Sequence, residues 1–80
     1  MTMNEQKRKY STGLTVYGTE IDLDALRYFI SLTIPVEELS VTGDEGHAEV
    51  CCLTAEPWKV LEYCATVGEM DNIRIGKAQG

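Results

Sequence analysis

The three cysteines are the side chains of this sequence with the widest range of chemistry, because thiolates bind zinc and exchange disulfides. Two of them, Cys51 and Cys52, are adjacent. Neighbouring residues of a strand point to opposite faces, so this pair cannot hold one ion together, and the usual spacing of zinc ligands is missing. We therefore predict that Cys52 and Cys64 are small core residues, that Cys51 lies on the other face, and that no metal is bound.

No other catalytic pattern can be found in the sequence. His47 is the single histidine, and the residues around it do not supply the partners of a hydrolytic triad. Neither the phosphate-binding pattern GxxxxGK[ST] nor the dinucleotide pattern GxGxxG occurs. The sequence predicts a protein that is not an enzyme and that uses no cofactor.

Acidic side chains dominate the charge of the chain. Thirteen Asp and Glu against seven Lys and Arg give a formal net charge of −6. Between Tyr28 and Trp58 there is no Lys or Arg, and there are six acids: Glu37, Glu38, Asp44, Glu45, Glu49 and Glu56. Affinity for phosphates depends on Lys and Arg, so we expect no direct contact with nucleic acid. We expect this segment to be a negative field without local compensation, which favours a partner with a basic surface.

Length and composition predict one small soluble domain. Eighty residues, with 44% apolar side chains, suffice for a single core. We expect a loose basic tail over residues 1–9 and one domain over residues 10–80. The apolar runs are too short for a membrane span or a signal peptide, and three irregularly spaced cysteines fit a reducing compartment. We therefore expect a cytoplasmic protein.

Alternation and turn residues predict strand, helix and hairpin in the first part of the chain. Residues 10–17 alternate as a strand that stops near Gly18. Thr19 or Asp22 can cap the helix that follows, and Pro35 ends it. Its apolar stripe comprises Leu23, Leu26, Phe29, Ile30, Thr33 and Ile34.

A hairpin, a helix and a last strand complete the prediction. The hairpin turns at Gly43-Asp-Glu-Gly46, between "ELSVT" and "HAEVCCL". The second helix begins at Pro57 and ends at Gly68, and the strand "NIRIGKA" follows. The residues expected to face inward on the second helix are Trp58, Leu61, Cys64, Ala65 and Val67.

This order of elements predicts an α+β fold of the ferredoxin-like βαββαβ type. Right-handed crossovers give a four-stranded antiparallel sheet in the order 4-1-3-2, with both helices on one face. With Leu39, Val41, Val50 and Cys52 facing the helices, the opposite face carries Glu38, Ser40, Thr42, Glu49, Cys51 and Leu53 with Tyr17 and Arg74. We call this opposite side the open face.

Two families with this layout suggest binding functions. "LTVYGT" resembles the shorter motif of RNA-recognition domains, but "HAEVCCL" lacks the aromatic and basic residues of their longer motif. The layout also resembles ACT-type regulatory domains, which bind amino acids where paired domains meet. That resemblance implies ligand contacts in the loop Gly18–Asp22 and a ligand-sensing dimer.

The acidic segment has a structural and a functional interpretation. It can be a solvated surface that keeps the domain soluble. Alternatively Glu38, Asp44, Glu45 and Glu49 contact a basic partner, with Tyr17 and Leu53 as apolar anchors. In size and charge the chain is similar to small phage-encoded inhibitors, including anti-CRISPR proteins, several of which are nucleic-acid mimics. That similarity implies a non-enzymatic inhibitor that occupies a nucleic-acid-binding surface, with a homodimer through the open face as a further possibility.

Overall fold

The fold is known from a computed structural model that describes residues 9–77. Within that range the elements are β1 (Tyr10–Tyr17), α1 (Leu23–Thr33), β2 (Val36–Gly43), β3 (His47–Thr54), α2 (Pro57–Val67) and β4 (Glu69–Lys77). The predicted order of elements is therefore confirmed. The predicted tail lies outside the described residues except for Lys9, whose Nζ is 2.6 Å from Glu37 Oε2.

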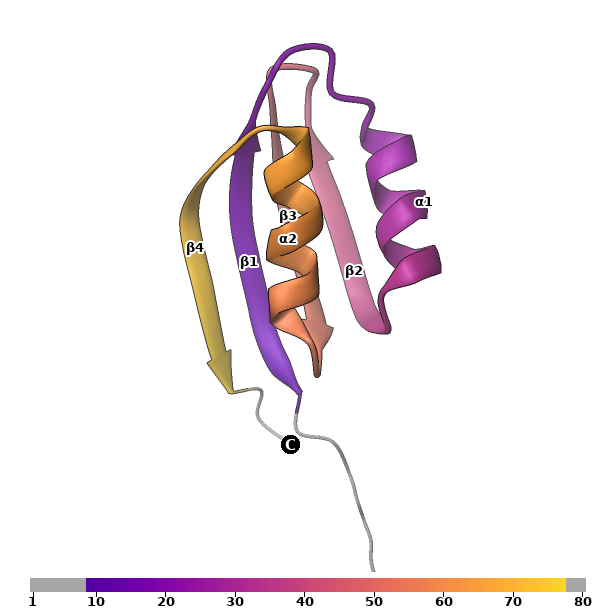
Figure 1. Cartoon of the computed structure of the whole chain (residues 1–80), viewed down its shortest axis with the longest axis vertical. Coiled ribbons are helices and arrows are strands. Elements are labelled where there is room, and N and C mark those ends of the chain that lie inside the picture. The colour runs from indigo at the N-terminus through magenta and orange to yellow at the C-terminus, as the bar shows by residue number, and fades with distance from the viewer. Residues whose placement is uncertain (1–8, 78–80) are drawn as a thin grey trace, which may run out of the picture.

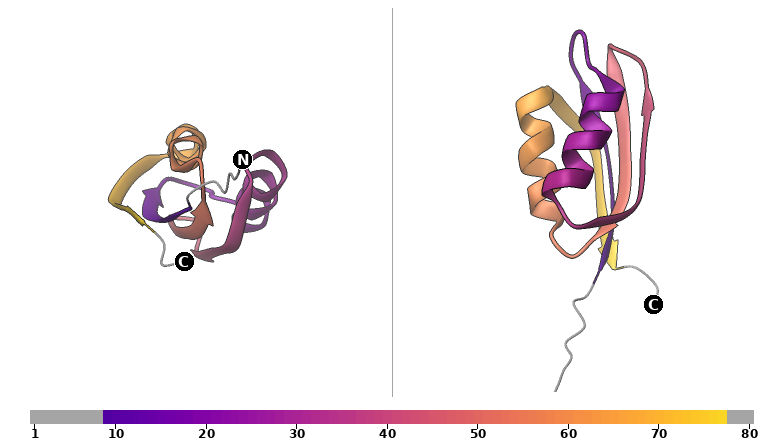
Figure 2. Two further views of the ribbon diagram at one scale, coloured as in Figure 1. Left: turned by 90° about the horizontal axis from the view of Figure 1, so that it is seen from below. Right: turned by 90° about the vertical axis from the view of Figure 1, so that its right-hand side faces the viewer.

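The four strands form one antiparallel sheet in the order β2-β3-β1-β4. This is the predicted order read in the opposite direction. Both helices pack on the same side of the sheet, and the other side is open (Figures 1 and 2). β1 and β3 are the central strands, and β2 and β4 are the edges.

The helix ends follow from local capping. Asp22 is the N-cap of α1, and its Oδ1 accepts a hydrogen bond from Ala25 N at 3.1 Å. Pro57 stands in the first turn of α2, and Gly68 follows its last residue. No helix within residues 9–77 is long and apolar enough to cross a membrane.

The core lies between the inner face of the sheet and the two helices. Leu14 and Val16 of β1 have no exposed surface, and their partners across the ladder are Val50 and Ala48 of β3. The predicted alternation of β1 and β3 is thus confirmed. The remaining buried apolar residues are Ile21, Leu26, Ile30, Ile34, Val41, Cys52, Val60 and Cys64.

The predicted inward faces of the helices are only partly correct. On α1, Leu26 and Ile30 are buried, whereas Phe29 is 46% exposed and packs edge-on against Tyr63 of α2 at 4.9 Å between ring centroids. Thr33, also assigned to the stripe, is exposed and donates its hydroxyl to the carbonyl of Phe29.

On α2 the predicted stripe is partly correct, because Cys64 is buried and Leu61 and Val67 pack half-buried against the core. Pro57, Val60 and Cys64 form its buried line. Trp58 is 58% exposed and Ala65 is exposed, although both were expected inside. Apolar residues occupy most of this helix, so its sequence pattern admits more than one inward face.

Both edge strands carry a bulge. The ladder of β2 shifts between Glu37 and Ser40, with Glu38 at φ 52°. The ladder of β4 shifts where it passes Leu14, with Asn72 at φ 53°. Bulges of this kind twist edge strands and interrupt their exposed hydrogen-bonding groups.

The thiols lie where the sequence predicts them. Cys52 and Cys64 are buried, whereas Cys51 is exposed on the open face. Burial is the main cause that raises the pKa of both core thiols to about 11. The three cysteines therefore differ sharply in accessibility.

Truncating the buried centre of α1 should come close to unfolding the domain. Leu26 is 2% exposed, and we expect Leu26→Ala to lower the free energy of unfolding in urea by about 2–5 kcal/mol. Leu32 on the same helix is 65% exposed, so Leu32→Ala should cost far less. Equal losses for the two variants would contradict this packing.

The thiols should react in two classes. At about pH 8 a thiol reagent should modify Cys51 in the folded protein, and Cys52 and Cys64 only after denaturation. The folded state retains the protons of the two core thiols up to about pH 11, whereas the unfolded chain releases them near 9.0. Stability should therefore fall as the pH rises through that window. Rapid modification of all three native thiols, measured by mass spectrometry, would refute the placement.

Candidate protein-binding surface

Two backbone segments meet at the end of the sheet where β1 ends. Gly18 N donates to Gly46 O at 3.1 Å, and Ile21 N donates to Glu45 O at 2.9 Å. These bonds join the β1–α1 loop to the turn between β2 and β3. The two segments form one end of the molecule, at the top in Figure 1.

Five carboxylates gather at this end. Together with Ile21, Leu23 and the guanidinium of Arg27 they line an open hollow of about 520 Å³. The five residues, which we call the acidic tip, are Glu20, Asp22, Asp24, Asp44 and Glu45. The tip therefore concentrates negative charge that comes from two separate parts of the sequence.

Two of these carboxylates also hold the backbone in place. Asp22 caps α1, as described above. Asp44 Oδ1 accepts from Gly46 N at 2.8 Å and His47 N at 3.1 Å. These hydrogen bonds, led by the one from Gly46, lower the pKa of Asp44, so its carboxylate stays ionised. His47 Nδ1 lies 3.3 Å from the same oxygen.

The other three carboxylates are directed to solvent. Asp24 lies 3.3 Å from Arg27 Nη1, yet its side chain is 90% exposed. Glu20 and Glu45 are exposed and form no ion pair within residues 9–77. Exposed pairs contribute little stability, so these charges are available to a partner.

The tip is not arranged as a metal centre. Among residues 9–77, no group of three or more His, Cys, Asp and Glu side chains is placed to hold an ion. The structure thus presents the carboxylates as a charged surface.

The six predicted contact residues do not form one patch. Asp44 and Glu45 belong to the tip. Tyr17 is beside it, at the end of β1, 48% exposed and with its ring centroid 6.3 Å from that of His47. Glu49 follows on the open face, opposite Thr15 and Thr42.

Glu38 and Leu53 lie toward the other end of the sheet. Leu53 pairs with Ser11 and Glu37 and is half-buried, and Glu38 stands in the bulge of β2. The ladder partners of Tyr17 and Leu53 show that they sit at opposite ends of β1 and β3. Strand residues rise about 3.3 Å each, so the two side chains are on the order of 20 Å apart. The two predicted anchors therefore lie far apart on the open face.

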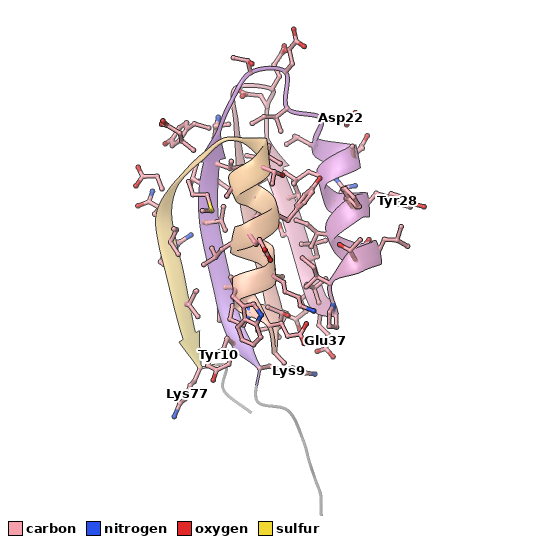
Figure 3. All side chains as sticks on the ribbon, viewed as in Figure 1. Lys9, Tyr10, Asp22, Tyr28, Glu37 and Lys77 are labelled. Carbon is pink, nitrogen blue, oxygen red and sulfur yellow. The ribbon has the colours of Figure 1, made fainter. Side chains whose placement is uncertain are left out.

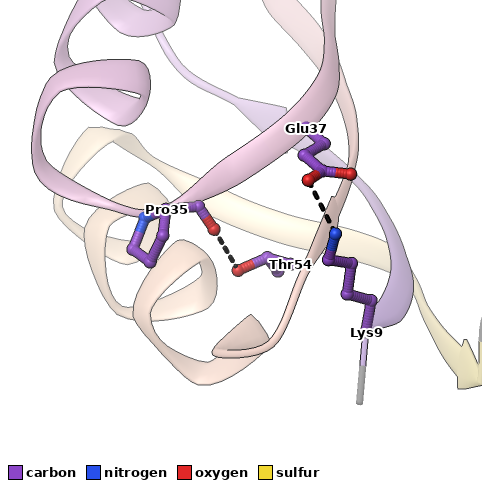
Figure 4. Close-up of polar contacts among 4 residues, drawn as sticks. All are labelled: Lys9, Pro35, Glu37 and Thr54. Atoms are coloured by element: carbon purple, nitrogen blue, oxygen red, sulfur yellow. Dashed lines mark hydrogen bonds and ion pairs between the residues drawn. The ribbon is translucent and has the colours of Figure 1, made fainter. Parts of the chain in front are cut away.

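Lysines outside the acidic segment neutralise part of its negative charge. Lys9 meets Glu37, and Lys59 Nζ lies 3.1 Å from Glu56 Oε1. Figure 4 shows the first pair beside the hydrogen bond from Thr54 Oγ1 to Pro35 O, 2.8 Å long, which joins the start of β2 to the end of β3. The expectation of a segment without local compensation is therefore wrong at this end.

The molecule is consequently polarised along its length. Figure 3 shows Asp22 near one end, and Lys9 and Lys77 near the other. Sequence reasoning missed Glu20, Asp22 and Asp24 as part of the acidic surface. The sequence did contain this signal, because in the predicted topology β1 ends at the same end of the sheet as the turn between β2 and β3.

Comparison of the chain with protein-family models, curated proteins and solved structures gives no match.

The shape of the tip should depend on one glycine. Gly43 has φ 131°, and a Cβ there would lie 2.3 Å from His47 O, whereas at Gly46 the nearest atom, Asp44 Oδ1, would be 3.4 Å away. We expect Gly43→Ala to lower the free energy of unfolding by roughly 1–3 kcal/mol. Gly46→Ala, the matched control, should have a small effect. Similar urea midpoints for both variants would contradict the turn geometry.

Proposed function

We propose that this chain is a small non-enzymatic, protein-binding inhibitor whose acidic tip occupies a basic surface of a partner that normally binds nucleic acid. The observation that carries the proposal is the convergence of five carboxylates at one end of the domain, around a hollow with one guanidinium. A rigid cluster of negative charge fits a groove built to receive phosphates. The inhibitor would act by competition, with no chemistry of its own.

The way the tip is built supports this role. Hydrogen bonds from the backbone hold Asp22 and Asp44 in place, so their charges are ordered before any partner arrives. Preorganised groups lose less conformational entropy on binding. In size and charge the chain is similar to acidic phage-encoded inhibitors such as anti-CRISPR proteins. A cytoplasmic partner would fit that similarity.

We also infer that the fold is of the ferredoxin-like type, since its element order and strand order are those of the split βαβ arrangement. That layout keeps an ACT-type ligand sensor as the alternative function. Its expected ligand loop, Gly18–Asp22, lies at the acidic tip, and the amides of Gly18 and Ile21 are bonded to the hairpin turn. A ligand carboxylate would meet repulsion there, so the inhibitor has more support.

Charge reversal at the tip should abolish partner binding without unfolding the domain. Asp22 and Asp44 are unsuitable targets because they cap backbone groups, so the change is Glu20→Lys with Glu45→Lys. The matched control is Glu38→Lys with Glu62→Lys, because Glu20 and Glu38 share a positive φ of 54° and 52°. Each pair of reversals changes the net charge of −6 by four units, to −2.

The measurement is quantitative mass spectrometry of proteins captured from host lysate by the wild type and both variants. We expect proteins retained by the wild type and the control but lost by the tip variant, and we expect added duplex DNA or RNA to displace them. Loss of binding should appear mainly in the association rate. Identical captured sets for both variants would exclude the tip as the contact surface. A rise in melting temperature with an amino acid would favour the ACT-type alternative.

A further inference from the structure

One flank of the domain leaves apolar side chains uncovered. Ile73 and Ile75 of β4 are 46% and 43% exposed, and Trp58 of α2 is 58% exposed. Ile75 pairs with Thr12, which lies on the helix side of β1 together with buried Leu14. The isoleucines therefore extend the inner face of the sheet beyond its helical cover.

The side of α2 that faces β4 continues this apolar surface. Tyr63 marks the side of α2 toward α1, because it packs on Phe29. At about 100° per residue, Leu61, Ala65 and Trp58 lie on the side away from α1. We call the whole surface the β4 flank: Trp58, Leu61, Ala65, Met70, Ile73 and Ile75.

The two edges of the sheet differ in this respect. At β2, α1 packs over the strand, and Val41 is 6% exposed. At β4, α2 is in contact with the strand, yet Ile73 and Ile75 stay nearly half exposed. An uncovered apolar strip beside an unpaired strand edge is typical of an interaction surface.

We propose that a second copy of this chain covers the β4 flank, by antiparallel pairing of the two β4 strands about a two-fold axis. The two sheets then form one continuous sheet of eight strands. The apolar side chains of the two β4 flanks meet on the helix side. Such an interface is isologous and closes at two copies.

The charges of β4 are complementary to themselves in this arrangement. Glu69 and Asp71 stand in its first half, Arg74 and Lys77 in its second. Antiparallel pairing brings the acidic half of one copy against the basic half of the other. Arg74 forms no ion pair in the part of the chain that the structure describes. Its guanidinium lies over Gly13 of β1, and in the proposed dimer it turns toward Asp71 of the other copy.

The bulge at Asn72 selects the register. Asp71, which precedes the bulge, lies on the open face opposite Thr15. Arg74, which follows the bulge, lies on the same face opposite Gly13. The faces of two copies then match when Asp71 stands opposite Arg74, and Met70 opposite Ile75, with the axis between residues 72 and 73. A straight partner strand would be out of step with the bulge, whereas an identical copy carries the same shift and compensates it.

The open face suits a second copy less well. It carries the acids Glu37, Glu49, Glu69 and Asp71 against the bases Arg74 and Lys9, of which Lys9 pairs with Glu37. Stacking two such faces would bring like charges together. The dimer that the sequence suggested for the open face is therefore proposed at the β4 edge instead.

The experiment is sedimentation equilibrium over a wide concentration range, with circular dichroism to confirm folding. We expect the wild type to reach twice the mass of one chain. Ile75→Asp should be a monomer. The control Leu32→Asp, which places the same charge at a position of α1 that is 65% exposed, should still dimerise. Asp71→Arg or Arg74→Asp alone should raise the dissociation constant about tenfold or more, because each change acts twice about the axis.

The double variant Asp71→Arg with Arg74→Asp should restore dimerisation, because it exchanges the two charges across the axis. Hydrogen exchange of the wild type gives a measurement that depends on no variant: protection should increase with concentration in β4, residues 69–77. A single-chain mass at every concentration overturns the proposal. So does a dimer lost in Leu32→Asp but kept in Ile75→Asp, or one that the charge exchange fails to restore.

The two proposals can fail separately. In an antiparallel dimer the acidic tips point to opposite ends, so neither tip is covered by the other copy. A protein that stays monomeric could still bind its partner through the tip. A dimer whose tip variant captures the same proteins as its control would refute the proposed function alone.

Discussion

The structure depends on burying β1 on both of its faces. It is paired on both edges, and Thr12 to Val16 have almost no exposed surface. On the inner side Leu14 and Val16 belong to the core, where α2 packs on β1 and α1 packs on β2. On the open side Gly13 has no side chain, which leaves room for Arg74, whose Nη2 would lie 3.0 Å from a Cβ at that position. β1 therefore positions β3, β4 and α2 directly.

The end of β1 links this core to the acidic surface. Where the strand stops, Gly18 and Ile21 donate to the carbonyls of the β2–β3 turn, and this contact brings two acidic loops together. Repulsion between the loops is offset because Asp22 and Asp44 accept hydrogen bonds from the backbone. The same carboxylates therefore stabilise local structure and supply charge. The side chains of Glu20 and Glu45 accept no such hydrogen bonds from the backbone, so the local structure does not depend on their carboxylates.

The two edge strands differ in how much of their apolar surface is exposed to solvent. Both have a bulge with a residue at positive φ, Glu38 in β2 and Asn72 in β4. A bulge discourages pairing with an ordinary strand, and α1 covers the inner face of β2 more fully than α2 covers that of β4. β4 retains apolar side chains and a charge pattern that complements itself. The proposed second copy would match both the bulge and the charges.

The elements and most of their faces can be predicted from the sequence. Asp22, Pro35, Pro57 and Gly68 mark helix ends through local hydrogen bonding and backbone restriction, and the alternation in β1 and β3 separates core from open face, including the different environments of Cys51 and Cys52. Local signals of this kind act over a few residues.

The rotation of α2 about its axis was decided by tertiary packing, because Trp58 and Val60 are both apolar and only packing selects Val60. The tertiary structure also decided where charge accumulates, since Lys9 neutralises Glu37 and Glu20 joins Glu45 across gaps in the chain that no local pattern spans. Electrostatic fields depend on distance in space, and only the fold supplies that distance.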